Sequence, residues 1–171
     1  MRHWLPLLVA VFMLEDSSAG TLPCTAPSET DIVALFERWN RTLQSADARA
    51  VVANYARRSV LLADGRRLPY LSAGAKQRYF QRLLKRRPAA TVEQRQLEIA
   101  CDTAVDAGTY TLHFADGSAQ TLGYSLSYQR FGRQWLIVSH RSAELPALSA
   151  FNAFSRPASF HPAPPPAATL P

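Results

Sequence analysis

The chain lacks the residue patterns on which several large classes of protein depend. It contains only two cysteines and four histidines, with no Cys/His spacing of the metal-binding kind. It has no GxSxG, HExxH, P-loop or dinucleotide-binding pattern and no internal repeat. These absences give no support to hydrolases of the GxSxG type, zinc proteases, nucleotidases or Rossmann enzymes, and we expect neither a metal nor a cofactor.

Long apolar runs are also scarce, and the clearest one lies at the N-terminus. Residues 1–20 combine a short basic start, an apolar core at 5–14 and small residues at 17–19, as in a secretory signal peptide. A buried N-terminal helix is the alternative, and Pro6 disfavours it. We expect cleavage after Ala19 or Gly20, a periplasmic or secreted protein, and no stable membrane insertion after cleavage.

Export changes the interpretation of the two cysteines, Cys24 and Cys101. In an oxidising compartment we expect them to form a disulfide, which would stabilise the fold by roughly 4 kcal/mol on the chain-entropy model. The alternative, a reactive thiol, has no neighbouring motif to support it.

The formal net charge of +6 comes mostly from arginine. The largest basic group follows one expected helix and its exit, and no aromatic interleaving or nucleic-acid motif accompanies it. We interpret it as a solvated helical face, with an anionic ligand or a membrane surface as the alternative contact, and we expect no nucleic-acid partner. This group consists of Lys76, Arg78, Arg82, Lys85, Arg86 and Arg87.

Three helices are expected in the N-terminal half. Ser28, Asp47 and Ser72 each precede a helical pattern and can act as an N-cap, and the third helix must end before Pro88. Between the last two helices, residues 60–63 form a short expected strand. The residues expected to face inward from the helices are Ile32, Leu35, Phe36, Trp39, Leu43, Val51, Val52, Tyr55, Tyr79, Phe80, Leu83 and Leu84.

Four strands are expected in the C-terminal half. Alternating apolar residues predict strands over 91–101, 103–114 and 122–129, and the continuous apolar run 135–138 predicts a strand covered on both faces. Asp102, Asp106 and Asp116 are assigned to turns. The fold class is therefore α+β, with three N-terminal helices on one face of a curved antiparallel sheet.

The domain boundaries follow from composition. Beyond Pro146 the chain is rich in proline and alanine, which predicts a disordered tail over 147–171, with a polyproline ligand or a spacer as alternatives. We therefore expect a signal peptide at 1–20, one folded domain at 24–146, and the tail.

The family resemblance is carried by five stretches: Phe36 to Asn40, Ser45 to Asp47, Cys101 to Thr111, Tyr124 to Tyr128, and Gly132 to Ser142. Over about residues 28–146 the chain resembles the association domain of calcium/calmodulin-dependent protein kinase II and its small bacterial relatives, including SnoaL-like proteins. These belong to the nuclear transport factor 2-like superfamily. The resemblance implies a cone-shaped fold with a pocket between the helices and the sheet.

The resemblance also implies a site and an assembly. Glu37, with His140 or Arg141, would point into the pocket and bind a small organic acid. The open sheet face with Ser125, Ser127 and Gln129 would form a homodimer or a higher homo-oligomer. Near the position where the association domain of the kinase directs a third-strand arginine into its pocket, this chain has Leu126.

His140 is the candidate catalytic residue, as a general base, with a structural hydrogen-bonding role as the alternative. Arg141 is the candidate pocket or interface cation. The remaining candidate pocket residues, which can equally be core, are Glu37, Trp39, Tyr55, Tyr110, Tyr124, Leu126 and Tyr128.

Two functions are compatible with these features. The first is a non-catalytic exported domain for oligomerisation and small-ligand binding, without kinase activity. The second is a SnoaL-like enzyme, an isomerase, cyclase or dehydratase that moves a proton beside a carbonyl group. A deep cavity with His140 and Glu37 facing each other favours the enzyme, and a cavity filled by Leu126 and the tyrosines favours the non-catalytic domain.

Overall fold

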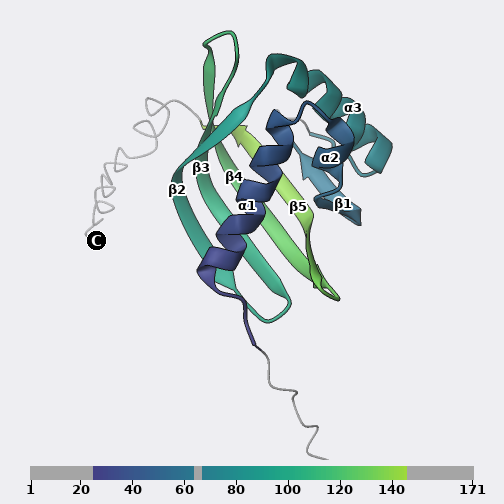
Figure 1. Ribbon diagram of the computed structural model, residues 1–171, viewed down its shortest axis with the longest axis vertical. Coiled ribbons are helices and arrows are strands. Elements are labelled where there is room, and N and C mark those ends of the chain that lie inside the picture. The colour runs from purple at the N-terminus through teal and green to yellow at the C-terminus, as the bar shows by residue number, and fades with distance from the viewer. Residues whose placement is uncertain (1–24, 64–66, 146–171) are drawn as a thin grey trace, which may run out of the picture.

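A long helix, α1 (Glu29–Gln44), crosses the concave face of a curved five-stranded sheet in the computed structural model (Figure 1). The structure describes residues 25–63 and 67–145. The expected signal peptide at 1–20, Cys24 and the tail at 147–171 lie outside the described residues, so these expectations remain predictions. No helix within the described ranges is long and apolar enough to cross a membrane.

The helices begin where the sequence places their caps. Ser28 and Asp31 form a reciprocal capping box at the start of α1, Asp47 caps α2 (Ala48–Val52), and Ser72 caps α3 (Ala73–Leu83). A short 3-10 helix, η1 (Leu84–Arg86), follows α3 and ends ahead of Pro88. In Figure 1, α2 and α3 lie together beside β1, at the opposite side of the sheet from β2.

The sheet has the strand order β1-β5-β4-β3-β2. β2, β3, β4 and β5 form a continuous antiparallel meander, and β1 pairs with β5 in parallel. The bounds of the strands are Tyr55–Leu62 for β1, Ala89–Ile99 for β2, Thr103–His113 for β3, Ala119–Phe131 for β4 and Gln134–Glu144 for β5.

Three expectations about the strands are corrected. The sheet is mixed, because β1 pairs with β5 in parallel, and the strand expected at 60–63 begins earlier, at Tyr55, which we had placed in the second helix. The last strand runs from Gln134 to Glu144, so the polar stretch 139–142, expected at its end, lies inside it. Asp106 lies in the middle of β3 and not in a turn. The short apolar run at 60–63 could not reveal the start of β1, because Arg57 and Arg58 interrupt its apolar pattern.

The two faces of the sheet differ in what covers them. The inner face, toward the helices, carries the buried residues of the strands, and the outer face carries half-buried or exposed ones. No described helix packs against the outer face. Inner residues are Ala104, Asp106, Tyr110, Leu112, Leu122, Tyr124, Leu126, Tyr128, Ile137 and His140; outer residues include Val105, Ala107, Thr109, Ser125, Ser127, Ser139 and Arg141.

Lys76 departs from the solvated basic face expected for its helix. Its side chain is buried, with 1% of its surface exposed, and its Nζ donates hydrogen bonds to the carbonyls of Ser59 (2.8 Å) and Leu71 (2.7 Å). Burial lowers the pKa of this amine. The lysine therefore ties the start of α3 to β1, whereas Arg78, Arg82 and Lys85 are exposed as expected.

Candidate functional site

The interior between α1 and the sheet contains a buried histidine and tyrosine in direct contact. His140 lies on β5 and Tyr55 at the start of β1, and Tyr55 Oη is 2.6 Å from His140 Nδ1. The two rings are nearly parallel, and Trp39 of α1 meets the His140 ring edge to face at 5.3 Å. Parallel pairing of β1 with β5 brings together two groups that are far apart in the sequence.

Burial keeps this pair uncharged. It lowers the pKa of His140 to about 3 and raises the pKa of Tyr55 well above its ordinary value. At neutral pH the imidazole is therefore neutral and the phenol keeps its proton. Such a pair can hold or orient a polar group without introducing a charge into the interior.

A second polar cluster lies on the inner face of β2, β3 and β4. The Asp106 carboxylate is fully buried; its Oδ1 accepts hydrogen bonds from Tyr124 Oη (2.6 Å) and from Arg95 Nε (3.1 Å). Burial raises the pKa of Asp106, and the contacts with Tyr124 and Arg95 partly offset that rise. Asp106 Oδ2 has no hydrogen-bond partner within the described part of the chain.

Little free space remains between these groups. The cavity beneath His140 has a volume of about 20 Å³, room for roughly one water molecule. Aromatic rings fill the rest: Phe36 lies 5.5 Å from Trp39 and 5.6 Å from Tyr124, centroid to centroid, and Tyr110 lies 5.1 Å from Tyr124. Between α1 and the sheet the described interior is a packed aromatic core, with a small void beneath His140.

The structure brings most of the candidate pocket residues together on the inner side. Each of these is buried: Trp39, Tyr55, Tyr110, Tyr124, Leu126, Tyr128 and His140. Glu37 is half-buried on α1. Their roles in ligand binding remain predictions, because packing alone accounts for their burial.

Arg141 lies on the other side of the sheet. It is opposite Ser125 in the register of β4 and β5, whereas His140 is opposite Leu126, so the two consecutive side chains point to opposite faces. Arg141 is exposed and His140 is buried. Arg141 therefore does not meet Glu37 inside the cone, and the acid–arginine site implied by the resemblance is not formed.

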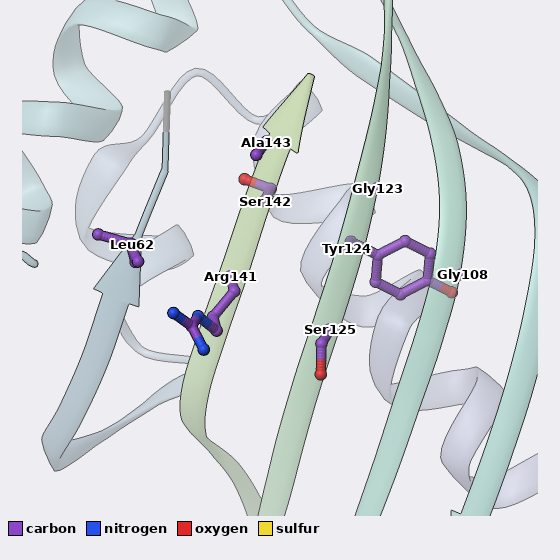
Figure 2. A pocket seen from close by; sticks show the side chains of 8 residues that line it. All are labelled: Leu62, Gly108, Gly123, Tyr124, Ser125, Arg141, Ser142 and Ala143. Carbon is purple, nitrogen blue, oxygen red and sulfur yellow. The ribbon is translucent and has the colours of Figure 1, made fainter. Parts of the chain in front are cut away.

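Arg141 instead lines an open hollow on the outer face, with a volume of about 450 Å³ (Figure 2). Leu62 on β1, Arg141 on β5 and Ser125 on β4 line it from three neighbouring strands. The Arg141 guanidinium forms no ion pair with any described residue. The larger hollow therefore lies on the sheet face that no described helix covers.

Sequence reasoning missed the Asp106 cluster, although one signal was present. Asp106 is two residues from Ala104 and four from Tyr110, so period-two alternation places it with the buried side chains. Arg95 faces it from β2, where a register shift between Val92 and Gln94 changes which residues point inward. Within the described ranges, no group of three His, Cys, Asp or Glu side chains could hold a metal ion.

Helices packed on one face of a curved, unclosed sheet define a nuclear transport factor 2-like protein. The structure resembles an NTF2-like protein of unknown function from Pseudomonas putida KT2440, with a TM-score of 0.60 and 19% identity over 67% of this chain and 84% of that one. It also resembles a protein from Streptomyces avermitilis described as a dehydratase of the NTF2-like family, with a TM-score of 0.58 and 11% identity over 69% and 97% of the two chains. At these identities the likeness concerns the fold.

The family follows from a match along most of the folded part. The model of the calcium/calmodulin dependent protein kinase II association domain matches residues 28–146, and the chain belongs to this family. A protein from Xanthomonas campestris described as such an association domain has a TM-score of 0.67 and 28% identity, over 71% of this chain and 90% of that one. No match was found among curated proteins.

Proposed function

We propose that the chain is an exported, non-catalytic oligomerisation domain that pairs with a second copy of itself through the outer face of its sheet. The observation that carries the proposal is the uncovered outer face, where small polar and apolar side chains lie half-buried beside a hollow of about 450 Å³. Membership of an association-domain family supports the same reading.

The composition of the outer face supports association. Val105, Ala107, Ser125, Ser127 and Ser139 lie on its central strands and are all half-buried. Short side chains of this kind let two sheets approach closely and lose little conformational entropy on burial. Arg141 adds a cation that a carboxylate or a carbonyl group of the partner can meet.

The enzymatic alternative has less support. The cavity beneath His140 has room for about one water molecule, and Arg141, an expected pocket cation, points away from it. A general base must lie within hydrogen-bond reach of an enclosed substrate, and Nδ1 of His140 is already engaged by Tyr55. The filled interior favours a domain that acts through its surface.

Light scattering on the purified chain tests the proposal. We expect an oligomer, and we expect Ser127→Arg to give monomers at the same concentration, because a long cation in the centre of the outer face keeps two sheets apart. Gln81→Arg, on the exposed side of α3, is the matched control and should leave the oligomer intact. A monomeric wild type, or an oligomer that Ser127→Arg leaves unchanged, contradicts the proposal.

A further inference from the structure

The last strand leaves the sheet on its outer face, beside a glycine. Gly123 of β4 faces outward, between the inner residues Leu122 and Tyr124, and lies opposite Ala143 of β5. A Cβ built on Gly123 would lie 3.0 Å from Cδ2 of Leu145. Gly123 does not adopt a positive φ, so its backbone does not require glycine. The missing side chain instead leaves room for Leu145, which lies over the outer face and is 48% exposed.

The hollow of about 450 Å³ on the outer face begins at the same glycine (Figure 2). Gly123 and Ala143 line it with little or no side chain, which leaves the space open. In Figure 2 the Arg141 side chain extends from β5 toward β1, where Leu62 lines the other side. Because Leu145 lies against Gly123, it stands at the rim, and the chain that follows it starts beside the hollow.

The chemistry of the hollow fits an aromatic ring. Leu62 and Ala143 supply apolar surface, and the Arg141 guanidinium forms no ion pair with any described residue. A guanidinium is attracted to the face of an aromatic ring, and such a ring also buries a large apolar area. A peptide segment with phenylalanine between small residues therefore suits this hollow.

The chain supplies such a segment shortly after Leu145. Phe151 and Phe154 follow within ten residues, separated from each other by Asn152 and Ala153. Six extended residues span at most about 20 Å, and the hollow begins beside Leu145, so the first ring can reach it with chain to spare. A segment held by a short linker has an effective concentration on the order of millimolar, so weak contacts suffice to hold it.

We propose that residues 146–154 turn back onto the outer face and place the rings of Phe151 and Phe154 in the hollow, one of them over the Arg141 guanidinium. The segment then occupies part of the surface that a second copy of the chain would cover. This regulation of assembly rests on the oligomerisation proposed above. Two copies pair only after each has released its segment, so the segment raises the concentration at which the oligomer forms.

The position of Leu145 favours docking within one chain over an exchange of segments between copies. Leu145 lies against Gly123 of its own β4, and the hollow of the same chain begins there. A segment that reached into the hollow of a second copy would tighten the oligomer, and loss of its rings would weaken assembly. The two arrangements therefore predict opposite effects for the same substitution.

Dilution of the full chain followed by light scattering measures the competition. The double variant Phe151→Ser/Phe154→Ser should lower the dissociation constant of the oligomer roughly tenfold, because its outer face is free for the second copy. Loss of two apolar side chains does not by itself promote nonspecific association, so this direction is specific. Phe160→Ser removes a ring beyond the proposed segment; it is the matched control and should leave the dissociation constant unchanged.

Docking of the segment is measured separately, on the full chain carrying Ser127→Arg, which is expected to be monomeric. Ser127 does not line the hollow. In this background Phe151→Ser/Phe154→Ser should shift the amide signal of Gly123 and the Nε–H signal of Arg141 in ¹H–¹⁵N NMR spectra, because the ring currents of two phenylalanines are lost. The control substitution at position 160 should leave both signals in place.

Two results would overturn the inference: spectra that the double substitution leaves unchanged, or an oligomer that it weakens or leaves at wild-type affinity. Neither result concerns whether the outer face pairs, so an oligomeric wild type keeps the oligomerisation proposal standing. A chain that is monomeric with and without the two rings, and whose Gly123 and Arg141 signals shift, contradicts the oligomerisation proposal and supports docking of the segment.

Discussion

The inner and outer faces of the same sheet have opposite chemistry. The inner face of β3, β4 and β5 combines large aromatic side chains with buried ionisable ones, each in contact with a neighbour. The outer face of the same strands carries serine, threonine, alanine and valine side chains, with Arg141 as its exposed cation. Alternation along each strand lets one sequence specify both faces independently.

This difference implies that the inner face contributes to stability and the outer face to association. The inner face holds the fold together, because its polar groups lose their partners if the packing changes. The side chains of the outer face make few contacts within the chain. Substitutions there are therefore expected to alter association more than the free energy of unfolding. The following predictions test this comparison, in order of decreasing effect on the free energy of unfolding.

The largest effect is expected at the buried carboxylate of the inner face. Asp106→Ala should lower the free energy of unfolding by about 3 kcal/mol, because it leaves Arg95 and the Tyr124 hydroxyl without their buried acceptor. The matched control is Asp102→Ala, which removes an exposed Asp–Arg pair with Arg130 and should cost less than about 0.5 kcal/mol. Urea unfolding followed by circular dichroism measures both. Equal losses in the two variants would contradict the comparison.

The next effect is a dependence of stability on pH. Because the pKa of His140 falls to about 3 in the fold, the unfolded chain takes up a proton below its ordinary pKa of 6.5 and the folded chain does not. Between pH 6.5 and pH 5 stability should therefore fall by up to about 1.4 kcal/mol per pH unit, and so by about 2 kcal/mol in total from this group. The raised pKa of Asp106 acts in the opposite sense, because the folded chain then binds the extra proton.

Variants separate the His140 contribution from that of other groups. Urea unfolding at several pH values should show a shallower loss of stability on acidification in His140→Gln than in wild type. His113→Gln changes an exposed histidine and should keep the slope of wild type. If His140→Gln and wild type lose stability in parallel, the histidine is not held neutral in the fold.

A smaller effect is expected from the tyrosine that contacts His140. Tyr55→Phe should cost about 1 kcal/mol, because it removes the hydroxyl that hydrogen-bonds with His140 Nδ1 and leaves that buried atom unpaired. Tyr128→Phe is the control, since the Tyr128 hydroxyl is buried but has no hydrogen-bond partner within the described ranges. It should be neutral or slightly stabilising in the same denaturation assay. A larger cost for Tyr128→Phe than for Tyr55→Phe would contradict the prediction that the Tyr55 hydroxyl, and not the Tyr128 hydroxyl, stabilises the fold by hydrogen bonding.

The smallest effect on stability is expected on the outer face. Arg141→Ala should change the free energy of unfolding by less than about 0.5 kcal/mol, since its side chain is exposed and unpaired within the described chain. It should also leave the ¹⁵N signals of His140 in place, because the two side chains lie on opposite faces. A shift of these signals would show that a substitution on the outer face changes the surroundings of His140 on the inner face.

Much of the fold could be predicted from the sequence because its signals are local. The caps at Ser28, Asp47 and Ser72 and the strand alternation in the second half are confirmed, as is the α+β class. A strand was expected at 60–63, but its start at Tyr55 and its parallel pairing with β5 were missed, because that pairing is a long-range property of an edge strand. Exposed arginines at 57 and 58 interrupt its apolar pattern.

The candidate site was less predictable for a related reason. The order His140-Arg141 gives no indication of which residue faces inward, because a bulge in β5 beside Val138 shifts the alternation that the apolar run suggests. Asp106 was assigned to a turn because aspartate is common in turns. Its alternation with Ala104 and Tyr110 instead indicates a side chain on the buried face of the strand. Its partner Arg95 comes from a strand with its own register shift.

The parallel pairing of β1 with β5 has a consequence for how the protein forms. It joins segments about eighty residues apart, whereas the other strand pairs are neighbours in sequence. The meander of β2 to β5 can assemble from hairpins, but β1 cannot pair with the sheet until the last strand, β5, has been synthesised. Docking of β1 should therefore be the late, slow step of folding, and until it occurs His140 Nδ1 lacks its hydrogen bond with Tyr55.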